Sequence, residues 1–278
     1  MSSSVSFLYD FIQQHPNLFV LSGAGCSTAS GIPDYRDDTG AWKRRQPMTF
    51  QTFAGSRAAR QRYWARSMMG WPLFTRARPN GAHQALAVLE AHGFVRGLVT
   101  QNVDGLHQQA GSRAVIDLHG RLDQVVCLAC GKVRSRADFQ QELTELNPAW
   151  AARPAQQAPD GDADVDGVAF DTFQVPGCRH CGGVMKPDVV FFGENVPRER
   201  VQAALGLLDA ADAVLVVGSS LAVFSGFRFV RAAVERGLPT VAINLGRTRA
   251  DALLTCRIAE PCADVLTELA RIIDHRSS

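Results

Sequence analysis

The chain has 278 residues, 46% of them hydrophobic, and a formal net charge of +2 at pH 7. This length is more than one compact core usually holds, so we expect one large domain and a smaller one. The near-neutral charge argues against nucleic acid and against an anionic membrane surface as the main partner.

The sequence also carries no sign of export or membrane insertion. No apolar run approaches the ~18 residues of a membrane-spanning helix. Residues 1–6 have no basic side chain ahead of their apolar stretch, and the first arginine is Arg36. Secretory signals and organelle presequences need such basic residues. We therefore expect a cytoplasmic protein.

Strands and helices are expected to alternate along most of the chain. The predicted strands are the apolar runs at 18–22, 95–100, 115–118, 189–192, 213–218 and 240–244. The predicted helices are 5–14, 82–91, 198–211, 226–235 and 263–274. Continuous apolar runs are typical of strands that are covered on both faces of a parallel sheet. The pattern predicts a doubly wound α/β domain.

Two segments interrupt this alternation. Residues 39–79 are rich in Arg, Trp, Phe and Met and look helical in part. Residues 127–181 contain paired cysteines, and the stretch 147–167 between the pairs is rich in Ala, Pro, Asp and Gly. Because that stretch holds few bulky apolar residues, we expect it to be an exposed or mobile loop.

The stretch 21–42 begins like a phosphate-binding turn and then departs from that pattern. An apolar run leads into Gly23-Ala24-Gly25, but Thr28 stands where a dinucleotide fingerprint has its third glycine. A second polar turn, Gly31-Ile32-Pro33-Asp34, follows. No acidic residue ends a strand about 20 residues further on, which argues against a dehydrogenase.

Four cysteines form two C-x-x-C pairs, Cys127 with Cys130 and Cys178 with Cys181. In a chain without a secretory signal, such pairs favour a metal or redox site over structural disulfides. Zinc prefers four ligands of this kind in a tetrahedron, and a site with no open position is structural. The pairs lie further apart than in the common pattern, which we attribute to the 147–167 loop. Two unrelated buried pairs are the alternative.

Polar residues follow several predicted strands. Gln101, Asn102 and Asp104 come after 95–100 and are suited to hydrogen-bond a ligand, although Asp104 alone could be a helix N-cap. His119 follows 115–118, where an imidazole could act as a general base near neutral pH or have a structural role.

Two further strand ends carry ligand-binding or peptide-binding signals. Gly218-Ser219-Ser220 offers N–H groups and hydroxyls to a phosphate, and Asn244 could bind a ribose hydroxyl. The edge of the segment 189–192, before Gly193-Glu194, could pair with an extended peptide.

Taken together, these segments resemble the sirtuins, a family of NAD-dependent protein lysine deacylases. The matching motifs follow the family's order: GAGCSTASGIPDYR (23–36), TQNVDGLH (100–107), HG (119–120), the two C-x-x-C pairs, FFGE (191–194), GSSL (218–221) and INLG (243–246). Three further segments, RQRYWARSMMGWP (60–72), QVPGC (174–178) and GSSLAVFSGFRF (218–229), resemble the class II branch of the family. Without a presequence, a bacterial member is favoured.

The resemblance implies that NAD is cleaved rather than reduced. The acyl oxygen of a substrate lysine would attack C1′ of the nicotinamide ribose, releasing nicotinamide and forming an alkylimidate. His119 would then act as general base on the ribose hydroxyls, with Asn102 as a second catalytic residue. The products would be O-acyl-ADP-ribose and free lysine. The implied cofactors are NAD and one structural zinc ion, and the implied partner is an acyl-lysine protein or peptide.

The resemblance also implies two sets of binding residues. The NAD set is Gly23, Ala24, Gly25, Ile32, Pro33, Asp34, Tyr35, Arg36, Gln101, Asn102, Val103, Asp104, Gly218, Ser219, Ser220, Asn244, Leu245, Gly246 and Cys262. The substrate set is Tyr63, Arg66, Val190, Phe191, Phe192, Gly193, Glu194 and Leu221.

Tyr63 and Arg66 carry the prediction about the acyl group. They are spaced i, i+3 on a predicted helix and so share one face. The pair resembles a feature that another sirtuin branch uses for carboxylate-tipped acyl chains, which predicts a preference for acidic or long acyl groups over acetyl. The alternative is that Arg66 pairs with a neighbouring acid and Tyr63 packs.

These observations predict an α/β fold with three parts. Residues 1–38, 80–123 and 187–278 would form a Rossmann-like NAD-binding domain, 39–79 a helical and cofactor-loop insertion, and 124–186 a zinc-ribbon domain. Two other functions stay open: mono-ADP-ribosyl transfer or NAD hydrolysis in the same pocket, and a non-catalytic adaptor that binds zinc and NAD.

Overall fold

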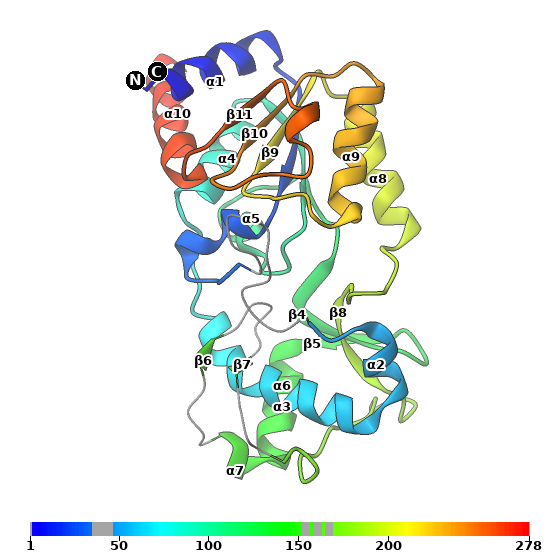
Figure 1. Ribbon diagram of the computed structural model, residues 1–278. Helices are drawn as coiled ribbons and strands as arrows, with labels where there is room; N and C mark the ends of the chain where they lie inside the picture. The colour runs from blue at the N-terminus through cyan, green and yellow to red at the C-terminus, as the bar shows by residue number, and fades with distance from the viewer. Residues whose placement is uncertain (1, 35–46, 152–155, 158–162, 165–168, 278) are drawn as a thin grey trace.

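The computed structural model describes residues 2–34, 47–151, 156–157, 163–164 and 169–277 (Figure 1). Tyr35 and Arg36, two of the expected NAD-binding residues, lie outside the described residues. The larger part of the molecule is built on a six-stranded sheet with the order β11-β10-β9-β1-β2-β3. Its strands are β1 (Leu18–Ser22), β2 (Val95–Thr100), β3 (Val115–Asp117), β9 (Ala213–Val217), β10 (Thr240–Ile243) and β11 (Cys256–Ile258).

All neighbouring strands of this sheet run parallel. The chain lays down β1, β2 and β3 toward one edge, and then β9, β10 and β11 toward the other. The strand order therefore reverses between β1 and β9. Ligands of doubly wound sheets bind in the crevice at the carboxyl ends of the strands at such a point.

Helices cover both faces of the sheet (Figure 1). One face packs against α1 (Ser3–Gln14), α4 (Gly81–Ala91) and α10 (Cys262–Ser277), and the other against α8 (Arg198–Asp209) and α9 (Phe224–Glu235). Strand β1 serves both faces, because Leu18 and Val20 join the first cluster and Phe19 and Leu21 the second. This double burial confirms the doubly wound sheet that the apolar runs predicted.

The smaller part of the molecule lies at the other end in Figure 1. Its three-stranded sheet has the order β5-β4-β8, with β4 (Gly120–Cys127) antiparallel to β5 (Val133–Ser135) and to β8 (Met185–Val189). Helices α2 (Phe50–Gly55), α3 (Arg57–Phe74), α6 (Arg136–Leu146) and α7 (Pro148–Ala151) pack beside it. The buried Trp64 of α3 connects helix and sheet, because its indole N–H donates to the Met185 carbonyl at 3.1 Å.

Short polar side chains start several of the helices, in line with their preference for N-cap positions. Ser2 caps α1, Ser135 caps α6, and Asn80 caps α4. The remaining elements are short: α5 (Leu106–Gln109), the β6 (Gln156–Gln157) and β7 (Ala163–Asp164) pair, and the 3-10 turns 24–26, 28–30 and 251–253. None of the described helices is long and apolar enough to span a membrane.

Two predictions about local structure were wrong. The run 189–192 is not a strand of the parallel sheet: β8 ends at Val189 and belongs to the small antiparallel sheet. Beyond it the chain turns, because the Glu194 carboxylate accepts from the Phe191 N–H at 2.9 Å and Gly193 has a φ of +77°. Strand β11 was not predicted, because it has only 3 residues.

The stretch 147–167 is not simply an exposed loop. It contains α7 and the β6–β7 pair. Trp150 is buried, with its ring centroid 5.4 Å from that of Phe170 and 5.5 Å from that of Phe173. One aromatic side chain thus anchors a segment whose average composition predicted exposure.

Candidate active site

The glycine turns after β1 and β9 lie in direct backbone contact. The Gly25 N–H donates to the Gly218 carbonyl at 2.8 Å, and the Gly23 N–H donates to the Val217 carbonyl at 3.0 Å. A Cβ on Gly25 would lie 2.9 Å from the Gly218 oxygen. Gly218 has a φ of +58°, and a Cβ there would lie 2.3 Å from the Cys26 nitrogen. Both positions therefore need glycine, because any side chain would push the turns apart.

A pocket of about 500 Å³ opens beside these turns, at the carboxyl ends of β1 and β10. Its volume is typical of ligand-binding clefts. Eight of the expected NAD-binding residues line it: Gly25, Ile32, Pro33, Asp34, Gly218, Asn244, Leu245 and Cys262. The other expected NAD-binding residues that the structure describes lie at the same edge of the sheet but do not line the pocket. They are Gly23, Ala24, Gln101, Asn102, Val103, Asp104, Ser219, Ser220 and Gly246.

Sequence reasoning missed several residues of the pocket wall. These are Cys26, Thr28, Ala29, Gly31, Ile243, Glu260, Pro261 and Ala263. Glu260 and Pro261 follow β11, so recognising that short strand would have pointed to them. Cys26 lies in the glycine turn, and nothing in the sequence around it indicated that it would line a cavity.

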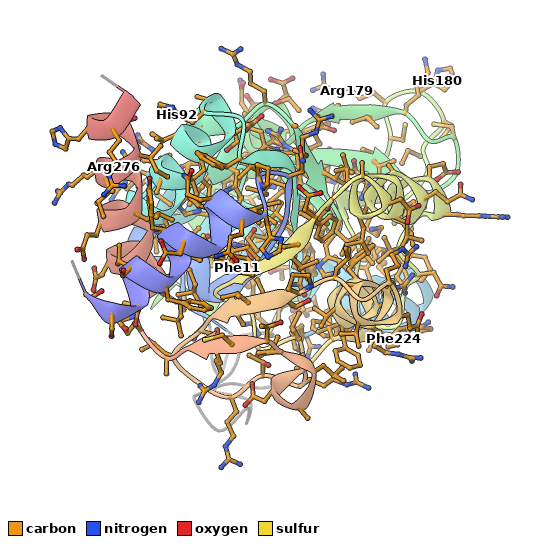
Figure 2. The ribbon with its side chains drawn as sticks, turned by 90° about the horizontal axis from the view of Figure 1, so that it is seen from above. Phe11, His92, Arg179, His180, Phe224 and Arg276 are labelled. Atoms are coloured by element: carbon orange, nitrogen blue, oxygen red, sulfur yellow. The ribbon has the colours of Figure 1, made fainter. Side chains whose placement is uncertain are left out.

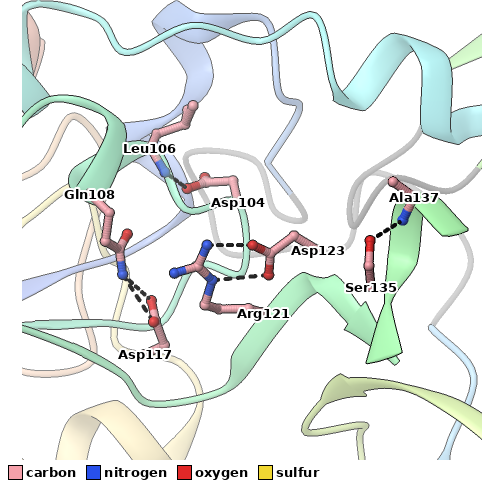
Figure 3. Close-up of polar contacts among 8 residues, drawn as sticks. All are labelled: Asp104, Leu106, Gln108, Asp117, Arg121, Asp123, Ser135 and Ala137. Atoms are coloured by element: carbon pink, nitrogen blue, oxygen red, sulfur yellow. Dashed lines mark hydrogen bonds and ion pairs between the residues drawn. The ribbon is translucent and has the colours of Figure 1, made fainter. Parts of the chain in front are cut away.

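The polar residues after β2 bind the turn after β1. Gln101 donates from its amide to the Ser219 hydroxyl at 2.8 Å. Asn102 donates to the Gly23 carbonyl and to the Ser27 hydroxyl, both at 3.0 Å. The Asp104 carboxylate accepts from the Ser27 hydroxyl at 2.7 Å and from the Leu106 N–H at 2.9 Å, the second of which is drawn in Figure 3. This network ties β2, β1 and β9 together at the edge where the pocket lies.

His119 is held at both ring nitrogens. Its Nδ1 lies 2.9 Å from the Gln101 carbonyl oxygen and its Nε2 lies 2.8 Å from the Ser225 hydroxyl. Because a carbonyl only accepts, the proton is on Nδ1, and the Nε2 lone pair accepts from Ser225. Burial lowers the pKa of His119, with a smaller contribution from the nearby arginines Arg200 and Arg228, while the bond to Gln101 opposes the shift. The ring is therefore neutral at neutral pH and able to act as a base.

The expected peptide-binding segment, residues 190–194, is hydrogen-bonded to the backbone of His119. The Val190 N–H donates to the His119 carbonyl at 2.8 Å, and the Phe192 carbonyl accepts from the Phe50 N–H at 2.9 Å. The backbone carbonyl of Phe192 is therefore already hydrogen-bonded to the first residue of α2. The other expected peptide-binding residue, Leu221, is 1% exposed with a φ of 55°, and its N–H donates to the Ser219 hydroxyl at 3.2 Å.

Tyr63 and Arg66 both lie half-buried on α3. The Tyr63 ring centroid is 5.2 Å from that of Phe191 and 5.4 Å from that of Phe53. Tyr63 therefore packs against one of the expected substrate residues.

The four paired cysteines converge at the far end of the small sheet. Their sulfur atoms all lie within 4.8 Å of one another, with Cys127 Sγ 3.5 Å from Cys181 Sγ and Cys130 Sγ 3.7 Å from Cys178 Sγ. A zinc ion with four thiolates at about 2.3 Å has sulfurs about 3.8 Å apart, so the donor set fits zinc.

The surroundings of the sulfurs agree with this fit. A Cβ on Gly183 would lie 2.9 Å from Cys127 Sγ and 3.1 Å from Cys181 Sγ, so glycine leaves the cluster room. Backbone N–H groups lower the pKa of Cys127 and of Cys178. The Gly183 N–H also lowers the pKa of Cys181, but the neighbouring thiols outweigh it and raise that pKa. His180 is exposed, at the outer edge of the molecule in Figure 2, and is not part of the four-sulfur cluster.

The fold and the site together indicate a nucleotide-binding protein with a structural zinc site. A doubly wound sheet with glycine turns at its strand-order reversal is the architecture of a nucleotide-binding domain. The small antiparallel sheet adds a four-cysteine cluster with the geometry of structural zinc.

Comparison with known proteins identifies the family. A family model described as "Sir2 family" matches residues 23–225. The chain is 64% identical to an NAD-dependent protein deacetylase of Xanthomonas campestris pv. campestris over 94% of this chain and 89% of the relative. It is 60% identical to one of Bordetella bronchiseptica over 96% and 97%, respectively. The chain belongs to the Sir2 family.

Solved structures agree with this assignment. A structure described as "Sir2-p53 peptide-NAD+" superposes with a TM-score of 0.73 at 30% identity, covering 98% of this chain and 97% of the other. Another, described as "Structure of Sir2Tm bound to a propionylated peptide", gives a TM-score of 0.73 at 29% identity and covers 99% of each chain.

Proposed function

We infer that this protein is an NAD-dependent protein lysine deacylase that converts an acyl-lysine peptide and NAD to nicotinamide, O-acyl-ADP-ribose and free lysine. The observation that carries the inference is the half-buried, neutral His119, fixed by Gln101 and Ser225 at the edge of the sheet where the pocket lies. The bacterial relatives named as NAD-dependent protein deacetylases support the same reaction.

His119 acts in this proposal as general base on a ribose hydroxyl of NAD. A base must be neutral at working pH, and burial keeps the pKa of His119 below its ordinary value. Asn102, proposed as the second catalytic residue, donates its amide to the glycine turn and to Ser27. It therefore holds the shape of the turn that NAD would contact.

NAD binding is proposed at the 500 Å³ pocket between the glycine turns and the start of α10. The crossing point of the two turns suits a pyrophosphate, because backbone N–H groups and small side chains allow close approach. Asn244 and Cys262 line the same pocket and suit the adenosine part. Asp34 and Ile32 also line the pocket, and in this proposal they contact the nicotinamide side of NAD.

The substrate peptide is proposed to lie between the turn 190–194 and the loop at Leu221. The segment after β8 bonds to the His119 carbonyl, which places it next to the base. Phe191 is 8% exposed and Leu221 is 1% exposed, so both support the site mainly through packing. The side chains of Tyr63 and Phe191 pack together, and we propose that they border the acyl group.

Zinc would hold the small sheet and take no part in the reaction. Cys127, Cys130, Cys178 and Cys181 would bind it and leave no open coordination position for chemistry. The proposed division of the chain follows the same logic: 1–38, 80–123 and 187–278 for NAD, 39–79 for the helices and the cofactor loop, and 124–186 for zinc. A cytoplasmic location remains a prediction from the sequence.

The test is to incubate the purified protein with NAD and acetyl-, succinyl-, glutaryl-, lipoyl- and long-chain-acyl-lysine peptides, and to identify products by mass spectrometry. We expect O-acyl-ADP-ribose, and none with His119→Ala. Faster turnover of acidic or long acyl groups than of acetyl would support the Tyr63 and Arg66 proposal, and the reverse order would refute it. ADP-ribose on protein, NAD hydrolysis without acyl transfer, or no turnover at all would refute deacylation.

A further inference from the structure

Ser225 contacts His119 although the two residues lie 106 positions apart in the sequence. It sits in the first turn of α9, and its side chain is buried, with the residue 9% exposed. The next residue, Gly226, lets the helix approach the strand end closely, because a Cβ there would lie 2.4 Å from Oε1 of Gln101. The start of α9 is therefore fitted tightly against the residues that hold His119.

The hydrogen bonds of His119 leave its base position already occupied. Nδ1 carries the proton and donates it to the Gln101 carbonyl at 2.9 Å. The single lone pair of the ring is on Nε2, and the Ser225 hydroxyl lies 2.8 Å from it. A ribose hydroxyl can lose its proton to His119 only by displacing Ser225 or by passing the proton through it.

We propose that Ser225 is a catalytic residue that relays the proton from the ribose hydroxyl to His119. The proposal rests on the deacylase function inferred above. In the relay, the O–H bond of the ribose breaks and its proton passes to the Ser225 oxygen. At the same time, the original Ser225 proton passes to Nε2 of His119. The ribose oxygen keeps the electron pair and becomes the nucleophile, Ser225 ends neutral, and His119 ends as imidazolium.

The geometry favours relay over displacement. The ring cannot turn Nε2 elsewhere without breaking the Nδ1 bond to the Gln101 carbonyl. The Ser225 hydroxyl cannot retreat easily, because it is buried at the start of a 12-residue helix. A hydroxyl has one proton and two lone pairs, so Ser225 can donate to Nε2 and still accept from a ribose hydroxyl. A chain of this kind keeps each proton transfer within hydrogen-bond distance.

The experiment separates the two chemical steps by rapid quench in single-turnover conditions, with NAD and the best acyl-lysine peptide. Nicotinamide release precedes the use of the base, and O-acyl-ADP-ribose formation follows it. We expect Ser225→Ala to release nicotinamide at nearly the rate of the unmodified protein and to form O-acyl-ADP-ribose about 10²-fold more slowly or worse. Ser225→Thr retains the hydroxyl and should restore product formation to within roughly tenfold.

A matched control is Ser112→Ala, which removes another buried hydroxyl, at 5% exposure, outside the site. It should behave like the unmodified protein in both steps. A second readout is the rate of product formation in mixtures of light and heavy water. Two protons moving in one step make this dependence curved for the unmodified protein, and the curvature should be lost in Ser225→Ala.

The outcomes distinguish the relay from the proposed function. If Ser225→Ala forms product at the unmodified rate or faster, Ser225 is only displaced by substrate and the relay is wrong. If Ser225→Ala loses nicotinamide release as well, Ser225 supports binding and the relay is again wrong. If the unmodified protein gives no O-acyl-ADP-ribose, the deacylase function itself fails, independently of Ser225.

Discussion

The Lys186 ammonium lies 3.2 Å from the Glu194 carboxylate, and together they hold the chain where β8 leaves the small sheet. Lys186 is 4% exposed and also donates to the Pro187 carbonyl at 3.2 Å. The same Glu194 oxygen accepts from the Phe191 N–H at 2.9 Å. One ion pair therefore shapes the turn 190–194 that we assign to the peptide.

Replacing Lys186 with Met should weaken both the fold and the peptide site. The change leaves a partly buried carboxylate, at 24% exposure, without its cation, and we expect the free energy of unfolding in urea to fall by about 2–4 kcal/mol. The KM for the acyl-lysine peptide should rise more than the KM for NAD, because the altered turn lies on the peptide side.

The double variant Lys186→Met/Glu194→Gln provides the control for this prediction. Removing both charges should recover part of the lost stability, since no unpaired charge then remains. A double variant as unstable as the sum of the two single ones would show that the ion pair is not the cause.

The decline of kcat/KM at low pH should follow the protonation of His119. Burial lowers the pKa of His119 from its ordinary value of 6.5, so the neutral base persists at lower pH than a solvent-exposed imidazole. We therefore expect the decline of kcat/KM on the acid side to be centred below pH 6.5. Steady-state rates from pH 5 to 8 would check this, and a decline centred above 6.5 would contradict it.

His107 should make the fold sensitive to acid. Burial lowers its pKa to about 3 from 6.5, with a smaller effect from His83. Below pH 6.5 the unfolded chain takes up a proton at this position and the folded chain does not. The free energy of unfolding should therefore fall with decreasing pH by up to about 1.4 kcal/mol per pH unit from this group.

His107→Gln is the variant that isolates this contribution. It removes the titration, so the slope of stability against pH between 6.5 and 5 should become shallower, whatever the change in absolute stability. Loss of the bond between His107 Nε2 and the Ser22 hydroxyl, 2.8 Å long, contributes equally at all pH values in this range. An unchanged slope would mean that His107 is already protonated in the folded protein.

The four-cysteine cluster should bind one zinc ion per chain. Elemental analysis of the purified protein would measure it, and Cys130→Ser should lose the metal together with much of the stability of the small sheet. Cys256→Ser changes a half-buried cysteine outside the cluster and should keep the metal. Full zinc content in Cys130→Ser would contradict the assignment.

Many features of this protein can be predicted from short stretches of its sequence. The apolar runs predict five of the parallel strands almost to the residue, because double burial requires continuous hydrophobic sequence. The glycines of 23–25 and the two C-x-x-C pairs predict a close-approach turn and a metal site, because few other residues permit either. Together these features, and the family resemblance they carry, were enough to predict the fold class and the chemistry.

Other features depend on contacts between distant segments, and only the tertiary structure decides them. The run 189–192 reads as a strand, yet the Glu194 carboxylate and the antiparallel pairing with β4 end the strand at Val189. Glu260 enters the pocket wall only because short β11 adds to the edge of the sheet. Ser225 meets His119 only because α9 packs against the strand end that carries Gln101. Local sequence records which side chains are buried, but not which distant partners bury them.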